Sequence, residues 1–454
     1  MGSRLTDSQQ YAHLWGRPEL ARVFDERARL QSWLDILSAL ATAQARVGLI
    51  PAEAATQIAV HARAEELNLD LVAQQTRQTS HSMLGVIRGL QAKVPDSTRD
   101  HVAYGVTVQD VTDTWLALVM REVGALVWRD LHTVEGSLLD LAVSHRDTLM
   151  LGRTHGQPGS PVTFGFKVAC WADEARRHLE RLRQGRPRWL VGQLAGSVGV
   201  LGFFGSEGSA LRAHFCTELG LGDPQISWLT SRDRVTEFCH LLSMICATIA
   251  RIGTEVYELQ RPEIGELREP GAPTAIGSIT LPRQRNPAIS EHLATLARLT
   301  RANAELLVEG MIVGHEGDDR GQQAEWVALS EVCLLTGTAL QLARRLVSGL
   351  HVDTDAMQAN LERYADQAAG ERLLLGLSER LGLYAAHQLL HELDTTGLGD
   401  VQQTVEAVVT AGVATAEECA DWLSRPSTGT AGEMVDTVVR RGLATRASEP
   451  ETWQ

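Results

Sequence analysis

Apolar side chains recur at steps of three and four residues along most of the chain, which is the period of a helix with one buried face. The segment 28–48 shows this spacing and stops at Gly48 and Pro51, two residues that end helices. The segment 109–147 keeps the spacing over an unusually long span. Runs that alternate as strands do are nearly absent, so the pattern predicts an all-α protein. Further long helices are expected over 163–186, 231–261, 287–313 and 322–349.

Helices of this length without a membrane signature usually pack into a long bundle. The pattern breaks near 100–105 and again near 350, where Asp353 stands at the position of a helix cap. We therefore predict three parts. These are an N-terminal helical domain (1–104), a central bundle of long helices (105–350) and a C-terminal helical domain (351–454) whose tail after 445 is disordered.

Composition narrows the possible partners. The net charge of −14 argues against nucleic acid, because phosphates are held by clustered Lys and Arg. No signal-like start and no apolar run of about eighteen residues is seen, so we expect a cytoplasmic protein without a membrane partner. The six cysteines form no CxxC pair and are expected to be buried reduced thiols. No metal and no cofactor is expected.

Four segments interrupt the helical pattern, and function tends to lie on such loops. The first is 151–165, where glycines and a proline force an irregular turn between two helices. Thr154 and His155 lie in this turn, and a histidine can exchange a proton near neutral pH. The segment is therefore a candidate proton-transfer site, although a surface loop whose histidine caps a neighbouring helix has the same composition.

The second interruption is 269–293. Its first half is rich in Gly and Pro, as in a mobile loop, and its second half leads into a helix expected to start at Pro287. A helix N-terminus flanked by two arginines is a good anion site, while the alternative is an ordinary long connection. The polar residues before the helix are Arg283, Gln284, Arg285 and Asn286.

Two shorter interruptions carry weaker signals. In 103–110, Thr107 and Gln109 precede a long helix and could bind a carboxylate, but capping alone is the favoured interpretation. In 76–83, His81 could be catalytic or could simply cap a helix start, and capping is again favoured.

Together these segments resemble the fumarase/aspartase superfamily, and within it the branch of adenylosuccinate lyase and 3-carboxy-cis,cis-muconate cycloisomerase. GSITLPRQRNP (277–287) is similar to the signature GSSxMPxKxNP. GRTHGQPGSPVTFG (152–165) is similar to GRTHxQ-x-A-x-P-x-TFG, and YGVTVQDVTDT (104–114) to HxGxTSxDxxDT. The segment 314–335 looks most like the cycloisomerases. The four segments follow the family's order and span nearly the whole chain.

The resemblance implies a homotetramer around a core of about twenty helices, in which three subunits build each active site. The four loops would then meet across subunit boundaries. The resemblance also implies reversible anti β-elimination from a substituted succinate, a small dicarboxylate, usually with release of fumarate.

Matching positions suggest roles for individual residues. Ser278 matches the serine that acts as the base, and His155 matches the histidine that passes a proton to the leaving group. A free hydroxyl is a poor base, so Ser278 must be activated by donors and by exclusion of water when its loop closes. Further residues expected to hold the substrate or its developing charge are Thr107, Gln109, Thr154, Arg283, Gln284, Arg285, Asn286, His81 and Arg320.

The chain departs from the family motifs at informative positions. Gln284 replaces the signature lysine, for which Arg283 is the natural substitute. Ile279 replaces the second signature serine and suggests a drier loop. Gly317 replaces the arginine of the cycloisomerase segment, where Arg320 is expected to compensate.

Two further positions separate the chain from each relative. Leu201 stands where adenylosuccinate lyases carry a glutamine, which disfavours a nucleotide substrate. His155 stands where typical bacterial cycloisomerases have tryptophan.

The leading prediction is a lyase that releases fumarate from an amino-, nitro- or N-substituted succinate, with a carbon–nitrogen lyase favoured. One alternative is a lactonising 3-carboxy-cis,cis-muconate cycloisomerase, which 314–335 favours. Another is a non-catalytic, crystallin-like scaffold, as the lost signature lysine would suggest. The leaving group is not determined, but 76–83 and 314–323 are expected to line its side of the pocket.

Overall fold

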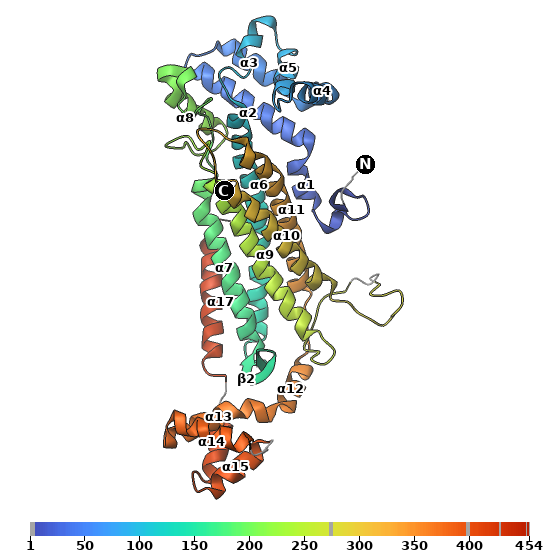
Figure 1. Ribbon diagram of the computed structural model, residues 1–454, viewed down its shortest axis with the longest axis vertical. Coiled ribbons are helices and arrows are strands. Elements are labelled where there is room, and N and C mark those ends of the chain that lie inside the picture. Colours follow the sequence, from blue (N-terminus) through green and yellow to red (C-terminus); the bar gives the residue numbers. More distant parts are fainter. Residues whose placement is uncertain (1–4, 272–275, 396–399, 426–427, 451, 454) are drawn as a thin grey trace.

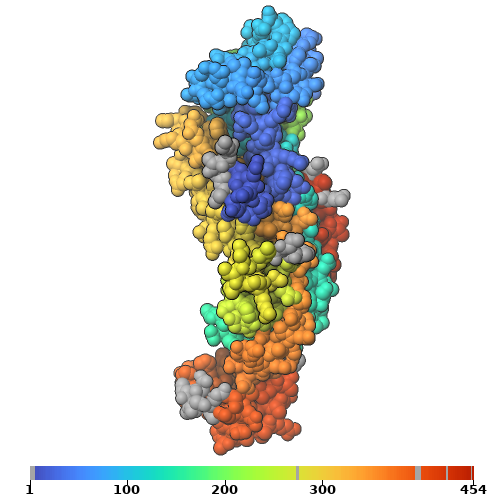
Figure 2. All heavy atoms as spheres, turned by 90° about the vertical axis from the view of Figure 1, so that its right-hand side faces the viewer, coloured from blue at the N-terminus to red at the C-terminus, as the bar shows by residue number. Residues whose placement is uncertain are grey.

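A computed structural model describes residues 5–271, 276–395, 400–425, 428–450, 452 and 453. The described chain is all-α apart from two short two-stranded sheets, which confirms the predicted fold class. The molecule is elongated, with N-terminal helices at one end, a bundle of long helices in the middle and small C-terminal helices at the other end (Figures 1 and 2).

The central bundle consists of the long helices that apolar periodicity predicted. Helix α6 is buried on more than one face, since every residue from Asp110 to Met120 is buried. Two of these helices, α9 and α11, are long and apolar enough to cross a membrane, but most of each is buried inside the bundle, as in the core helices of soluble proteins. The five helices are α6 (Val108–Ser144), α7 (Phe164–Trp189), α9 (Asp233–Leu259), α10 (Ala288–Glu309) and α11 (Asp319–Ser348).

Short helices cover one end of this bundle. Helix α2 (Glu26–Arg46) joins them to it by packing against both α3 and α6. Asp25 caps α2 by accepting a hydrogen bond from the Arg27 backbone N–H at 2.9 Å. The other helices at this end are α1 (Pro18–Phe24), α3 (Ala52–His61), α4 (Leu69–Thr79), α5 (Leu84–Gln91) and α8 (Gly208–Glu218).

A β-hairpin stands where an irregular turn was expected. Strands β1 (Leu149–Thr154) and β2 (Gln157–Thr163) pair antiparallel, so that prediction was wrong. The two residues between them, His155 and Gly156, have φ of 54° and 75°. Two consecutive left-handed residues form the tight turn whose twist matches the strands it joins. Glycine and proline interrupt the alternation in both strands, which hid the hairpin in the sequence.

The C-terminal part divides differently from the single domain predicted for 351–454. Four of its small helices enclose a core of their own, which includes Leu377, Val408 and Trp422. Helix α17 (Ala431–Ser448) instead returns to the bundle and packs along α6 and α7 (Figure 1). Strands β3 (Leu267–Arg268) and β4 (His351–Val352) and helix α12 (Thr354–Arg363), capped by Asp353 as predicted, link the two parts. The four small helices are α13 (Ala365–Leu381), α14 (Leu383–Thr395), α15 (Val401–Thr410) and α16 (Ala416–Ser424).

The tail after 445, which the sequence led us to expect as disordered, is ordered in its described part. Helix α17 continues to Ser448, and the side chain of Trp453 is only 4% exposed. Its indole Nε1 donates a hydrogen bond to the Leu182 carbonyl at 3.3 Å. Gly124 leaves room for this ring, because a Cβ at that position would lie 2.1 Å from it. The tail is thus held by a contact that is distant in sequence.

The thiols only partly match their prediction. All six cysteines are free and five are buried, but Cys170 on α7 is exposed. Burial raises the pKa of Cys216 to about 12, so that thiol stays protonated at neutral pH.

We predict that Trp453→Ala lowers the free energy of unfolding by about 3–5 kcal/mol, because it removes a large buried ring without refilling the space. Thermal and urea unfolding would measure the loss. Trp453→Phe is the control and should lose much less, since it retains an aromatic ring against Gly124. Equal stability of the alanine variant and the parent protein would contradict the packing of the tail.

Candidate active site

The predicted site residues lie in separate places on one chain (Figure 1). Thr107 and Gln109 stand at the first turn of α6, beside the N-terminal helices. Thr154 and His155 lie at the tip of the β-hairpin. The loop between α9 and α10 carries Ser278 and the polar residues that follow it.

The length of α6 sets the separation between the first two places. At 1.5 Å per residue, its 37 residues span roughly 55 Å from Val108 to Ser144. Gln109 therefore lies at one end of the bundle and His155 near the other. Among the described residues, no hydrogen bond connects Ser278 with His155, and none connects either of them with Gln109. One chain alone does not bring the predicted residues together.

The start of α6 is fixed by a buried carboxylate. Asp110 accepts hydrogen bonds from the backbone N–H groups of Thr107 at 3.1 Å, Ala195 at 2.8 Å and Gly196 at 3.1 Å. Burial raises the pKa of Asp110 to about 7, although these three donors lower it. Thr107 is the N-cap residue, so the capping interpretation of this segment holds.

Gln109 is already engaged inside the chain. Its amide nitrogen donates to the Leu229 carbonyl at 2.7 Å and to Asp113 at 3.1 Å. To hold a substrate carboxylate through this amide, Gln109 would have to exchange one of these contacts.

A buried ion network stands behind Gln109. Arg232 donates to both oxygens of Asp113, at 2.8 and 2.9 Å, and also pairs with Glu325 of α11. Burial alone would lower the pKa of Arg232, but the two carboxylates outweigh it and raise that pKa, so the guanidinium stays charged. The network ties α6, the segment before α9 and α11 together at this end of the bundle.

The hairpin has a rigid base and an exposed tip. Arg153 donates to both oxygens of buried Glu266, at 2.9 and 2.6 Å, and Asn360 of α12 donates to the same carboxylate at 2.8 Å. Thr154 and His155 are exposed beyond this base. The imidazole is therefore presented outward, where another surface could meet it.

The loop that carries the signature segment 277–287 closes on itself. Residues 272–275, which belong to the predicted loop, lie outside the described residues. The Asn286 amide donates to the Gly277 carbonyl at 2.7 Å and joins the two ends of the loop. Ser278 Oγ accepts from the Leu281 backbone N–H at 3.0 Å and lies 3.2 Å from Thr280 Oγ1. No carboxylate, imidazole or amine of the described residues hydrogen-bonds to this hydroxyl, so none of them is placed to activate it as a base.

The start of α10 does not offer the anion site that the sequence led us to expect. The carboxylate of Glu269 accepts from the backbone N–H of Ile289 at 2.9 Å and from the N–H and hydroxyl of Ser290, both at 3.0 Å. The N–H groups that would have bound a substrate anion are thus taken by the chain's own carboxylate. Arg283, Gln284 and Arg285 remain exposed in the loop before the helix.

His81 and Arg320 are occupied by local contacts. His81 Nδ1 accepts from the backbone N–H groups of Leu84 at 3.0 Å and Met83 at 3.3 Å, so it caps the start of α5, as the favoured interpretation held. The proton of the neutral ring is then on Nε2, and His81 as a whole is exposed. Arg320 pairs with Asp318, the N-cap residue of its own helix, and this pairing lowers the pKa of Asp318. Arg320 would have to leave Asp318 to bind substrate.

Known proteins resemble this chain over most of its length. Residues 15–299 match the protein family described as Lyase. The N-acetyl-S-(2-succino)cysteine lyase of Dickeya dadantii strain 3937 is 37% identical over 445 residues, covering 97% of this chain and 98% of the relative. The adenylosuccinate lyase of Methanocaldococcus jannaschii is 35% identical and covers 83% of this chain and 82% of the relative.

A solved structure has the same fold. The 3-carboxy-cis,cis-muconate lactonizing enzyme of Pseudomonas putida superposes with a TM-score of 0.85 at 30% identity, covering 97% of this chain and all of that one. The bundle, hairpin and loops therefore define a lyase of the fumarase/aspartase type. The chain belongs to this lyase family, in the branch that includes adenylosuccinate lyase and 3-carboxy-cis,cis-muconate cycloisomerase. Proteins of this superfamily act on small dicarboxylates and are typically oligomeric.

We predict that Arg232→Leu lowers the free energy of unfolding by about 3–5 kcal/mol, because Asp113 and Glu325 would be left buried without their cation. Chemical unfolding monitored by circular dichroism would measure the change. Arg188→Leu is the matched control. Arg188 pairs with Glu237 at the surface, where an ion pair contributes about 1 kcal/mol or less. Equal losses in the two variants would show that the buried network does not stabilise the fold.

Proposed function

We propose that this enzyme eliminates a thiol from a succinyl thioether, and that its substrate is N-acetyl-S-(2-succino)cysteine or a close analogue. The supporting observation is the 37% identity to the Dickeya enzyme over nearly the full length of both chains, whereas the adenylosuccinate lyase matches a shorter part. The leaving atom would then be sulfur, in place of the nitrogen that the sequence analysis favoured. The products would be fumarate and N-acetylcysteine.

The proposed reaction removes one proton and breaks one bond. A base takes a proton from the carbon next to the distal carboxylate, and the electrons left on that carbon form the double bond of fumarate as the C–S bond breaks. Ser278 is the proposed base, and His155 is the proposed donor of a proton to the departing sulfur. A thiol has a pKa of about 8.5, so its sulfur leaves readily with modest help from an acid. Arg283 and Arg285 would stabilise the dianion that precedes bond breakage.

We also propose a cytoplasmic homotetramer whose subunits share the active sites. The separation along α6 supports this proposal, because a second chain is needed to bring a hairpin tip next to a start of α6. Large apolar side chains exposed along the bundle would be covered in such an assembly; they include Met244, Leu299, Leu306 and Val327. The other predicted ligands, Thr107, Gln109, Thr154, Gln284, Asn286, His81 and Arg320, would act at the shared sites.

A cycloisomerase is the second candidate. The likeness to the lactonizing enzyme of Pseudomonas putida supports it. His155, where typical cycloisomerases have tryptophan, favours the elimination. The non-catalytic scaffold has no such support, since the chain belongs to a family of lyases.

We predict that the purified protein converts N-acetyl-S-(2-succino)cysteine to equal amounts of fumarate and N-acetylcysteine. Fumarate absorbance and a thiol reagent would measure the two products, with an enzyme-only blank for the exposed Cys170. Adenylosuccinate and 3-carboxy-cis,cis-muconate are the comparison substrates. Faster turnover of either one than of the thioether would sink the proposal.

We predict that Ser278→Ala and His155→Ala each lower kcat by about 100- to 10,000-fold, the usual effect of losing an acid or a base. Mixing the two inactive proteins under conditions that exchange subunits should restore activity at up to about a quarter of the sites, where both residues come from intact chains. Ser424→Ala, in the distant α16, is the control and should keep full activity. No recovery in tetramers shown by mass to be mixed would contradict shared sites.

A further inference from the structure

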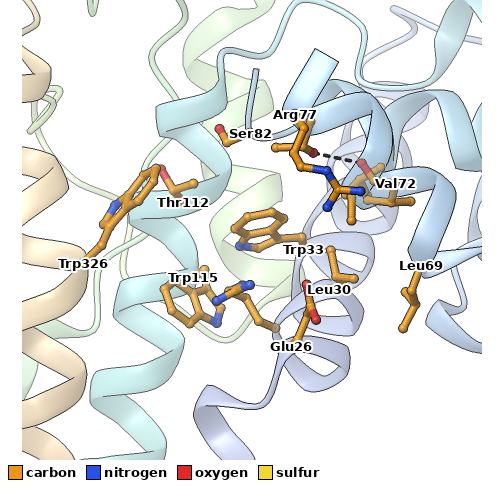
Figure 3. A pocket seen from close by; sticks show the side chains of 14 residues that line it. Glu26, Leu30, Trp33, Leu69, Val72, Arg77, Ser82, Thr112, Trp115 and Trp326 are labelled. Carbon is orange, nitrogen blue, oxygen red and sulfur yellow. Dashed lines mark hydrogen bonds between the residues drawn. The ribbon is translucent and has the colours of Figure 1, made fainter. Parts of the chain in front are cut away.

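A cavity of about 390 Å³ lies beside the start of α6, between α2, α4, α6 and α11 (Figure 3). It brings together segments that are far apart in the sequence. Thr76, Arg77 and Ser82 come from the interruption that contains His81, and Trp326 comes from the cycloisomerase-like segment 314–335. A volume of this size suits a small organic molecule.

The cavity wall is aromatic and is fixed in place. Figure 3 shows the indoles of Trp33, Trp115 and Trp326 arranged around it. Trp33 and Trp115 pack edge to face at 6.5 Å, and each is only 8% exposed. Of the other lining residues, five are aliphatic and six are polar or charged, so a ligand here would meet polar groups beside the indoles.

Three polar groups of the wall lack partners among the described residues. The indole Nε1 groups of Trp33 and Trp326 are buried without a hydrogen-bond acceptor, and so is Nε of Arg29. The Arg29 guanidinium stacks over the Trp33 ring at 5.6 Å, and no carboxylate of the described chain forms an ion pair with it, although Glu26 also lines the cavity. Buried N–H groups without acceptors are costly, so all three point to a ligand that supplies oxygen acceptors.

The cavity lies close to the proposed reaction centre. Thr112, which lines it, follows Gln109 by three residues on α6, a rise of about 5 Å. Trp115 follows by another three residues and also lines the cavity. A group that extends from a succinyl carbon near Gln109 along this face of α6 would enter the cavity.

We propose that this cavity is the subsite for the leaving group and that it selects an N-acylated amino acid thiol. The carboxylate of the leaving group would pair with Arg29, its acyl carbonyl would accept the hydrogen bond of Trp33 Nε1, and its methyl group would lie against the indoles. This inference rests on the proposed function, which it deepens by assigning the residues that choose the leaving group. Arg29 and Trp33 belong to the N-terminal helix α2, outside the segments that carry the elimination chemistry.

Trp33→Phe removes the indole N–H while keeping an aromatic ring. We expect it to raise KM for N-acetyl-S-(2-succino)cysteine about five-fold, the effect of one lost hydrogen bond, with kcat little changed. KM for S-(2-succino)cysteine, which has no acyl carbonyl, should stay the same. Trp128→Phe is the matched control, because Trp128 Nε1 is also buried without a partner but lies outside the cavity.

Arg29→Met removes the cation while keeping the length of the side chain. We expect it to raise KM about ten-fold for both cysteine thioethers, the effect of losing a hydrogen-bonded charge. KM for N-acetyl-S-(2-succino)cysteamine, which lacks the cysteine carboxylate, should not change. Arg27→Met, an exposed arginine of the same helix that does not line the cavity, is the control.

Calorimetric titration with N-acetylcysteine separates this inference from the proposed function. If the parent protein cleaves the thioethers but each variant behaves like its control, the subsite is wrong and the elimination stands. If no succinyl thioether is cleaved, the proposed function fails, and the titration alone decides on the cavity. Binding that the two controls keep and the two cavity variants lose would support the subsite, and no binding to the parent protein would overturn it.

Discussion

The length of one buried helix determines how this enzyme can be built. Helix α6 spans the bundle, with Gln109 at its start and the hairpin that carries His155 beyond its end. It cannot be shortened or bent without breaking the core, because its first turns are buried on every side. The distance between the two candidate groups is therefore a fixed property of the subunit, and the proposed tetramer would bring together groups from different subunits.

The polar groups around the candidate site are already satisfied within the chain. Glu269 holds the N–H groups at the start of α10, Asn286 closes its own loop, and Asp113 takes one donor of Gln109. These contacts fix the local conformation of each segment within the single chain. The proposed substrate contacts would replace several of them, so binding would exchange hydrogen bonds at modest net free energy.

The sequence predicted those features whose cause is local. Apolar periodicity located the long helices to within a few residues, and the motifs located the loops that interrupt them. The hairpin was missed because glycine and proline break its alternation, and the capping of α10 was missed because Glu269 precedes that helix by some twenty residues. The burial of Trp453 depends on Gly124, which lies far away in sequence, so no local pattern could show it. In the sequence, Arg29 and Trp33 fit the pattern of an ordinary amphipathic helix. Only the fold shows that they line the same cavity as Trp326.

The proposed leaving group also accounts for the lost signature lysine. With Gln284 in its place, the loop has no positive charge at the lysine position, and Arg283 and Arg285 are the cations beside it that would stabilise the dianion before the bond breaks. A thiol leaves with a pKa of about 8.5, whereas an alkyl amine must be protonated to leave at all, with a pKa near that of lysine at about 10.4. Elimination from a thioether therefore needs less stabilisation of the dianion and less help from an acid. Arg283 and Arg285 could supply that stabilisation. Selection of the substrate would then rest on the cavity between the helices, while the loop supplies only the part of the chemistry that all succinyl substrates share.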